Sequence, residues 1–146
     1  MDIQAPAGMR IISRESFFYS TPLIAALAGG ADSLQFVNIQ ADGDFVIMKT
    51  MFYGEYNGAG DVTDQTRPLP PVTVNVTDTG SGTRLTREPV FIGSFAGYGS
   101  LPMIWNQPRL VRANSSIEVL FNNLGATQVE NLQLTFAGVR VQYAGL

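Results

Sequence analysis

The last third of the chain has the clearest alternation of apolar and polar residues. Between residues 116 and 143 two runs keep a period of two, and Asn123-Leu124-Gly125 separates them. The apolar positions are Ile117, Val119, Phe121, Leu132, Leu134 and Phe136. A period of two is typical of a β-strand with one buried face. The pattern therefore predicts two long strands that bury one face each against a second layer.

The second of these runs changes its parity at Gly138. Beyond this residue the apolar positions are Val139, Val141 and Tyr143, which alternate out of phase with Phe136. A shift by one residue at a glycine is typical of a β-bulge or a bend. We therefore expect the final strand to be bent and the fold to be a two-layer antiparallel sandwich.

Earlier segments give the same kind of signal. Leu34–Gln40 and Asp44–Tyr53 flank Ala41-Asp42-Gly43, and Asp-Gly predicts a hairpin turn between them. The second of these segments is apolar on both faces, so we expect one face in the core and the other under an arm, a loop or a partner. Its two apolar sets are Phe45, Ile47, Met51 and Tyr53 against Val46, Met48 and Phe52. Val72, Val74 and Val76 alternate with polar residues and predict a strand with one buried face.

Two long segments are expected to be loops. Gly54–Pro71 and Gly93–Pro108 are rich in glycine or proline, and loops of this length often have a binding role. Tyr56, Tyr98 and Trp105 are their candidate contact residues. Phe95, Tyr98 and Trp105 could form a platform for a sugar, but we favour a role in which they plug the end of the sandwich or meet a neighbouring subunit. With seven or eight strands, the fold class is all-β, an antiparallel β-sandwich of the jelly-roll kind.

Residues 1–33 differ from the rest and are assigned to an N-terminal arm, with residues 34–146 as the jelly-roll domain. Thr21 as N-cap, Pro22 as first helical residue and Gly29 as terminator predict one short helix here. Two interpretations stay open, a strand and helix that close the chain's own core or an arm that lies on a neighbouring subunit. The candidate partner-binding residues of the arm are Met9, Ile11, Ile12, Phe17, Phe18 and Tyr19.

Composition narrows the class of protein. The 146 residues are 45% apolar but only 14% charged, so much of the surface is neutral and suited to contact with other protein. The net charge is −3, and the nine basic residues are scattered, which argues against a nucleic-acid partner. We expect a homo-oligomer, because such a surface leaves more apolar area than one chain can cover.

The chemistry available to the chain is limited. It has no cysteine and no histidine, so a disulfide framework, a thiolate nucleophile and a histidine-based metal site of the cupin type are excluded. Asp42 and Asp44 are better explained as turn residues than as half of a calcium loop, and Asp61 and Asp64 give little support to a glycosidase. We expect no enzyme activity, no cofactor and no metal. The first residues do not resemble a signal peptide, and no apolar run could span a bilayer, so we also expect no membrane partner and a cytoplasmic site of assembly.

Several segments together resemble the small jelly-roll structural proteins of tailed bacteriophages. These segments are Asn38–Ile47, Val72–Gly82, Leu101–Pro102, Pro108–Ile117 and Leu134–Val141. The resemblance implies a virion protein, closest to the capsid cement or decoration proteins, which bind the major capsid protein on the outside of the head at capsomer junctions. Such proteins are dimers or trimers and have no catalytic residues. A minor head, tail or spike subunit of the same kind, or a carbohydrate-binding module, are the alternatives.

Overall fold

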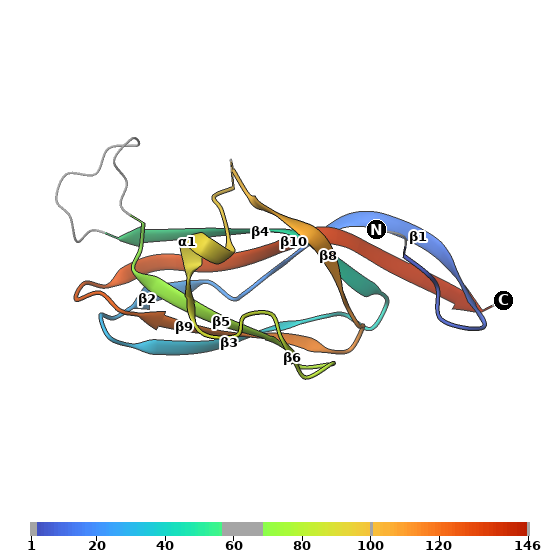
Figure 1. Ribbon diagram of the computed structural model, residues 1–146, viewed down its shortest axis with the longest axis horizontal. Coiled ribbons are helices and arrows are strands. Elements are labelled where there is room, and N and C mark those ends of the chain that lie inside the picture. The colour runs from blue at the N-terminus through green and yellow to red at the C-terminus, as the bar shows by residue number, and fades with distance from the viewer. Residues whose placement is uncertain (1–2, 57–68, 100, 146) are drawn as a thin grey trace.

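The computed structural model describes residues 3–56, 69–99 and 101–145 and consists of two antiparallel sheets packed together (Figure 1). Sheet A has the strand order β1 (Met9–Ser20), β10 (Val129–Gly145), β4 (Asp44–Tyr56) and β8 (Met103–Val111), and β2 (Ile24–Leu27) also pairs with β10. Sheet B has the order β3 (Asp32–Asn38), β9 (Ser116–Asn123), β5 (Val72–Asp78) and β6 (Thr83–Arg84), and β7 (Val90–Phe91) also pairs with β5. One helical turn, α1 (Ile92–Phe95), follows β7. The predicted all-β sandwich is confirmed.

The core lies between the two sheets and contains the apolar faces that alternation predicted. All nine of the strongest alternating positions are 0% exposed, and they come from β5, β9 and β10. They are Val72, Val74, Val76, Ile117, Val119, Phe121, Leu132, Leu134 and Phe136. Burying such side chains is the main favourable contribution to folding, at roughly 25 cal/mol for each Å² removed from water.

The change of parity at Gly138 coincides with a bulge, as predicted. The register between β10 and β4 shifts between Ala137 and Gly138, and the extra residue is Met48 of β4. Against β1 the register of β10 runs without interruption from residue 135 to residue 142, so Val139 faces away from Phe136. Gly138 is required here because a Cβ atom would lie 1.8 Å from the carbonyl oxygen of Val46.

The bulge also corrects the predicted faces of β4. Phe45, Ile47 and Phe52 lie in the core together, although the sequence pattern put Phe52 on the opposite face from the other two, because the extra residue at Met48 reverses the alternation. Tyr53, which the pattern grouped with Phe45 and Ile47, is 46% exposed on the opposite face.

The Asp42-Gly43 turn does not form the predicted hairpin. β3 pairs with β9 in sheet B, while β4 pairs with β10 and β8 in sheet A, so this turn carries the chain from one sheet to the other. Gly43 allows a close approach, since a Cβ atom there would lie 2.6 Å from the carbonyl oxygen of Val141. A local sequence that is typical of a hairpin turn therefore connects the two layers here.

The predicted helix after Thr21 is wrong, because residues 24–27 form strand β2. Leu27 is 4% exposed and stands opposite Val129 in the ladder with β10. The Thr21 hydroxyl accepts a hydrogen bond from the Leu134 amide at 3.1 Å, and the Thr21 amide donates to the Leu134 carbonyl at 2.9 Å. Thr21 thus bonds to the neighbouring strand instead of capping a helix, and tertiary pairing overrides the local signal.

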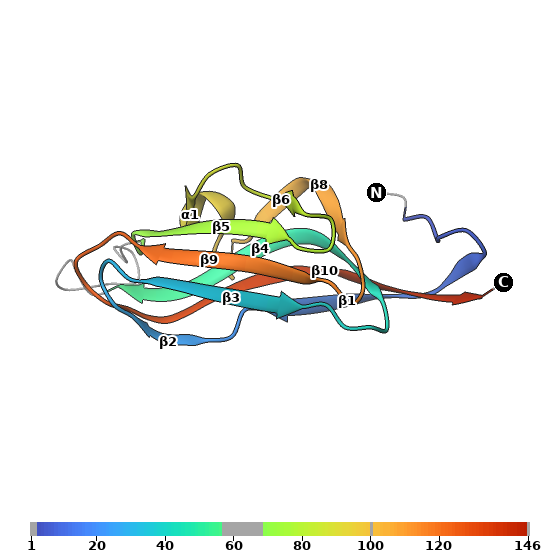
Figure 2. The same cartoon turned by 90° about the horizontal axis from the view of Figure 1, so that it is seen from below.

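β1 is a strand of sheet A and pairs with β10 along its whole length, from Met9 opposite Gly145 to Ser20 opposite Thr135. Beyond Val141, β10 has lost β4 as a neighbour and keeps only β1. The two-stranded ribbon made by residues 9–13 and 142–145, here called the terminal ribbon, projects beyond the sandwich (Figures 1 and 2).

Candidate functional site

The aromatic residues of the predicted arm divide between core and surface. Tyr19 is 7% exposed, its ring lies 4.8 Å from that of Phe45, and its hydroxyl accepts a hydrogen bond from the Gln40 amide at 3.2 Å. Phe17 is half-buried, with its ring 4.9 Å from that of Tyr19. These two side chains contribute to the protein's own core.

Other side chains of the same strand face solvent. Met9, Ile12 and Phe18 are 47%, 56% and 60% exposed. Met9 and Ile12 belong to the terminal ribbon, with the half-buried Ile11 between them. Phe18 alternates with Phe17, so it lies on the outer face of sheet A.

Arg140 fixes the base of the terminal ribbon. Its guanidinium donates to the carboxylate of Glu15 on β1, to Asp42 at 3.1 Å and to Gln40 at 3.2 Å. It also lies 4.4 Å from the centre of the Phe17 ring, a cation–π contact. The hydrogen bond with Glu15, followed by the negative charge of Asp42, raises the pKa of Arg140. One cation therefore links β10 and β1 to the turn that joins the two sheets.

The loop aromatics are placed differently from the prediction. Tyr56 is the last residue of β4, stands opposite Val129 and packs against the core. Most of the first predicted loop, residues 57–68, lies outside the described residues. The second predicted loop is wrong at both ends, because α1 occupies its start and β8 begins at Met103.

Trp105 is therefore a strand residue and is partly buried. Its indole Nε1 donates to the Thr50 hydroxyl at 3.1 Å, and its ring lies edge-on to that of Phe95 at 5.8 Å. Thr50 is itself fully buried and donates to the Phe95 carbonyl at 2.6 Å. These contacts hold the indole at the edge of the core, where it packs between the layers.

Tyr98 lies beside an apolar hollow that the sequence did not single out. Its ring packs 5.1 Å from that of Phe52, and the hollow has a volume of about 420 Å³. The segment between α1 and β8, which contributes half of the lining residues, projects from the body of the sandwich in Figure 1. The exposed apolar residues that line the hollow are here called the loop patch. They are Leu69 (56% exposed), Tyr98 (36%), Leu101 (77%), Met103 (39%) and Ile104 (73%). The available signal was the run of apolar residues inside a predicted loop.

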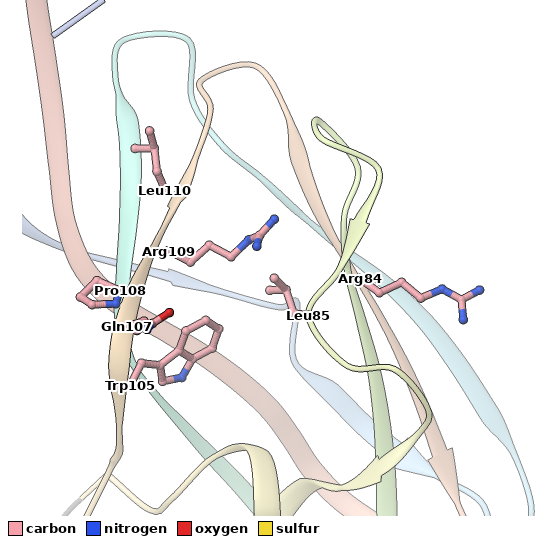
Figure 3. A pocket seen from close by; sticks show the side chains of 7 residues that line it. All are labelled: Arg84, Leu85, Trp105, Gln107, Pro108, Arg109 and Leu110. Atoms are coloured by element: carbon pink, nitrogen blue, oxygen red, sulfur yellow. The ribbon is translucent and has the colours of Figure 1, made fainter. Parts of the chain in front are cut away.

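A second depression, here called the lateral cleft, lies at the side of the sandwich between β8 and the β6 region (Figure 3). Its volume is about 520 Å³. The lining residues are Arg84, Leu85, Trp105, Gln107, Pro108, Arg109 and Leu110. Trp105, Arg109 and Leu85 point into the gap, whereas Arg84 points outward and Pro108 lies on the far side of β8 (Figure 3).

The acidic residues that the sequence singled out are placed in ion pairs or lie outside the described residues. No group of three acidic residues is placed to hold a metal ion in residues 3–56, 69–99 and 101–145. Asp44 accepts from Arg112 Nη1 at 3.0 Å and from the Ala113 amide at 2.8 Å, and Asp42 pairs with Arg140. Asp61 and Asp64 lie outside the described residues. In the part of the chain that the structure describes, no helix is long and apolar enough to cross a membrane.

Comparisons with known proteins give only weak structural likeness. No family model and no curated protein matches the chain. The solved structure described as "Crystal Structure of FLHE" is 12% identical, with a TM-score of 0.36, and the alignment covers 86% of this chain and 96% of that chain. A likeness this weak says nothing about function.

Proposed function

We propose that this protein is a virion structural protein of a tailed bacteriophage, a cement or decoration protein that binds the outer surface of the capsid across capsomer junctions. The partner is the major capsid protein, and the protein acts as a homo-oligomer, a dimer or a trimer. Attachment takes place through the terminal ribbon and the loop patch, and the binding stabilises the head.

One observation supports this proposal above the others. Large apolar side chains are exposed on the terminal ribbon and on the loop patch instead of packing in the core. Ile12 on the ribbon and Leu101 and Ile104 in the loop patch are 56%, 77% and 73% exposed. Exposed apolar patches on projecting segments are typical of protein–protein contact surfaces, and buried anchors provide most of the energy of such contacts.

The rest of the fold suits a structural role. Arg140 fixes the base of the ribbon, so the ribbon has a defined direction and little entropy is lost when it binds. The surface contains few charges to desolvate. A stable contact needs roughly 800 Å² from each partner, and two separate projecting surfaces can contact two different capsomers.

Of the alternatives, the carbohydrate-binding module receives less support. A sugar platform needs its aromatic rings side by side, but Trp105 lines the lateral cleft and Tyr98 lines the separate apolar hollow. A minor head, tail or spike subunit would use the same exposed surfaces, and the test below distinguishes it by its location in the virion.

The test compares binding to capsids that lack the protein. Ile12→Ser on the ribbon and the double variant Leu101→Ser with Ile104→Ser on the loop patch should reduce co-sedimentation with such capsids by tenfold or more. Leu34→Ser is the matched control, because Leu34 is 48% exposed but lies on β3 of sheet B. Each variant is first compared with the parent for its melting temperature.

Three results would decide against the proposal. Ribbon and loop variants that bind as the parent does would remove both surfaces from attachment. Equal weakening by the Leu34 control would show a general solubility effect. Localisation of the protein to the tail by electron microscopy would assign it to another virion component.

A further inference from the structure

The lateral cleft is built around a cation whose hydrogen-bonding capacity is only partly used. Arg109 Nη2 lies 3.3 Å from the Ser81 hydroxyl and 3.6 Å from Asp78 Oδ2. Its Nε is buried without a hydrogen-bond partner among the described residues. A guanidinium has five donors in a planar fork that matches a carboxylate. The buried Nε cannot reach a ligand, but the side chain is 30% exposed, so the outer nitrogens of Arg109 can donate to a further acceptor in the cleft.

The acid beside Arg109 already has its own donors. Asp78 is 3% exposed and accepts from the Gly80 amide and the Ser81 hydroxyl, both at 3.0 Å. It holds Arg109 in position without forming a close ion pair. The ionisable residues that line the cleft are Arg84 and Arg109, both basic. Even with the carboxylate of Asp78 beside Arg109, the two arginines leave the cleft with a net positive charge, in a protein whose net charge is −3.

A bulge in β8 shapes the cleft. Ile104 stands opposite Lys49 and Arg109 opposite Ile47, so four residues of β8 correspond to one of β4. Bulges re-aim side chains, and here Trp105 and Arg109 both face the gap toward β6 (Figure 3). β8 is also the edge strand of sheet A and pairs with β4 alone among the described strands, so its outer backbone groups are available to an added strand.

We infer that the lateral cleft binds an extended, acidic segment of a partner polypeptide. The segment lies along the outer edge of β8, a carboxylate of the segment accepts from the Nη atoms of Arg109, and Gln107 and the edge of the Trp105 ring contact its neighbouring residues. Charge complementarity favours an acidic occupant, since a basic segment would meet Arg109 inside the cleft and Arg84 at its margin. This proposal does not depend on the capsid role, because the cleft includes neither the terminal ribbon nor the loop patch.

The test uses Trp105, which is the single tryptophan of the chain. The full-length protein is titrated with a capped peptide of alternating glutamate and valine, and the tryptophan emission is recorded. We expect a saturable change in emission that weakens as salt is added. The matched peptide of alternating lysine and valine should produce none.

Three variants locate the binding. Arg109→Gln should weaken binding by about tenfold, the loss expected for one charge-assisted contact. Gln107→Glu places a negative charge in the cleft on an exposed side chain, so it should abolish binding of the acidic peptide even if Arg109→Gln fails to fold. Arg87→Gln makes the same charge change on an exposed residue outside the cleft lining and should bind as the parent does.

The proposal is overturned if the parent shows no saturable change. It is also overturned if the lysine peptide binds equally well, or if Arg87→Gln weakens binding as much as the cleft variants do. None of these results would bear on capsid attachment, which the ribbon and loop variants test separately.

Discussion

Replacing Gly138 with alanine tests the bulge at the centre of sheet A, because the bulge decides whether the change raises or lowers the free energy of unfolding. In most extended strands this change stabilises a protein by about 0.5–1 kcal/mol, because it restricts the unfolded chain. Gly138 has no positive φ that would forbid alanine. A Cβ atom there would, however, lie 1.8 Å from the Val46 carbonyl oxygen and 2.9 Å from its carbon.

The size of the effect follows from that contact. Real Cβ atoms essentially never come within 3.0 Å of such a neighbour, so the backbone of β4 must move by more than 1 Å. Overpacking of this kind costs about 1–3 kcal/mol, and the cost here falls on backbone that is hydrogen-bonded in the ladder. Because that backbone cannot easily move, we take the upper end of this range, about 3 kcal/mol, and after subtracting the entropic gain we expect Gly138→Ala to lower the free energy of unfolding by about 2 kcal/mol. For a chain of this length that corresponds to a melting temperature lower by about 4–8 °C.

The measurement is thermal and guanidinium unfolding of Gly138→Ala beside Gly145→Ala, followed by circular dichroism. Gly145 lies near the end of the same strand, and a Cβ atom there would meet nothing within 4 Å. That control should stay within about 0.5 kcal/mol of the parent. A Gly138→Ala protein as stable as the parent, or more stable, would refute the close approach of β4 and β10 at the bulge.

Further predictions concern the core, the stability of the protein at alkaline pH, and self-association. Phe136→Ala should cost about 3–5 kcal/mol, since the side chain is fully buried, whereas Phe18→Ala, at 60% exposed, should change stability by less than about 1 kcal/mol in the same denaturant titration. Burial, followed by the negative charge of Asp44, raises the pKa of Tyr143 above its usual value of 10. The folded state therefore favours the neutral phenol, so the contribution of Tyr143 to the free energy of unfolding is present below pH 10 and is lost as the pH rises toward the folded pKa. A Tyr143→Phe protein whose alkaline unfolding profile matched the parent's would contradict this. Light scattering at micromolar concentration should show a dimer or trimer, and a clean monomer would count against self-association in solution.

The sequence alone was enough to predict the class of fold and the centre of its core. A period of two is a local property, so the apolar faces of β5, β9 and β10 could be predicted without knowing their partners. The parity change at Gly138 also predicted the position of the bulge, although not that the extra residue is Met48 on the neighbouring strand. The absence of cysteine and histidine by itself limits the chemistry that the chain can perform.

Only the tertiary structure decided which strands are neighbours and which apolar side chains remain outside. Asp42-Gly43 has the same turn chemistry in a hairpin and in a crossing between layers, so pairing with β9 or with β10 determines its role. Residues 24–27 became a strand because β10 offers them a ladder and a buried site for Leu27. Tyr19 and Phe18 are neighbours in sequence, yet one packs in the core and the other faces solvent. Local sequence limits the conformations of a segment, but hydrogen-bond pairing and burial between distant segments provide most of the free energy that selects one of them.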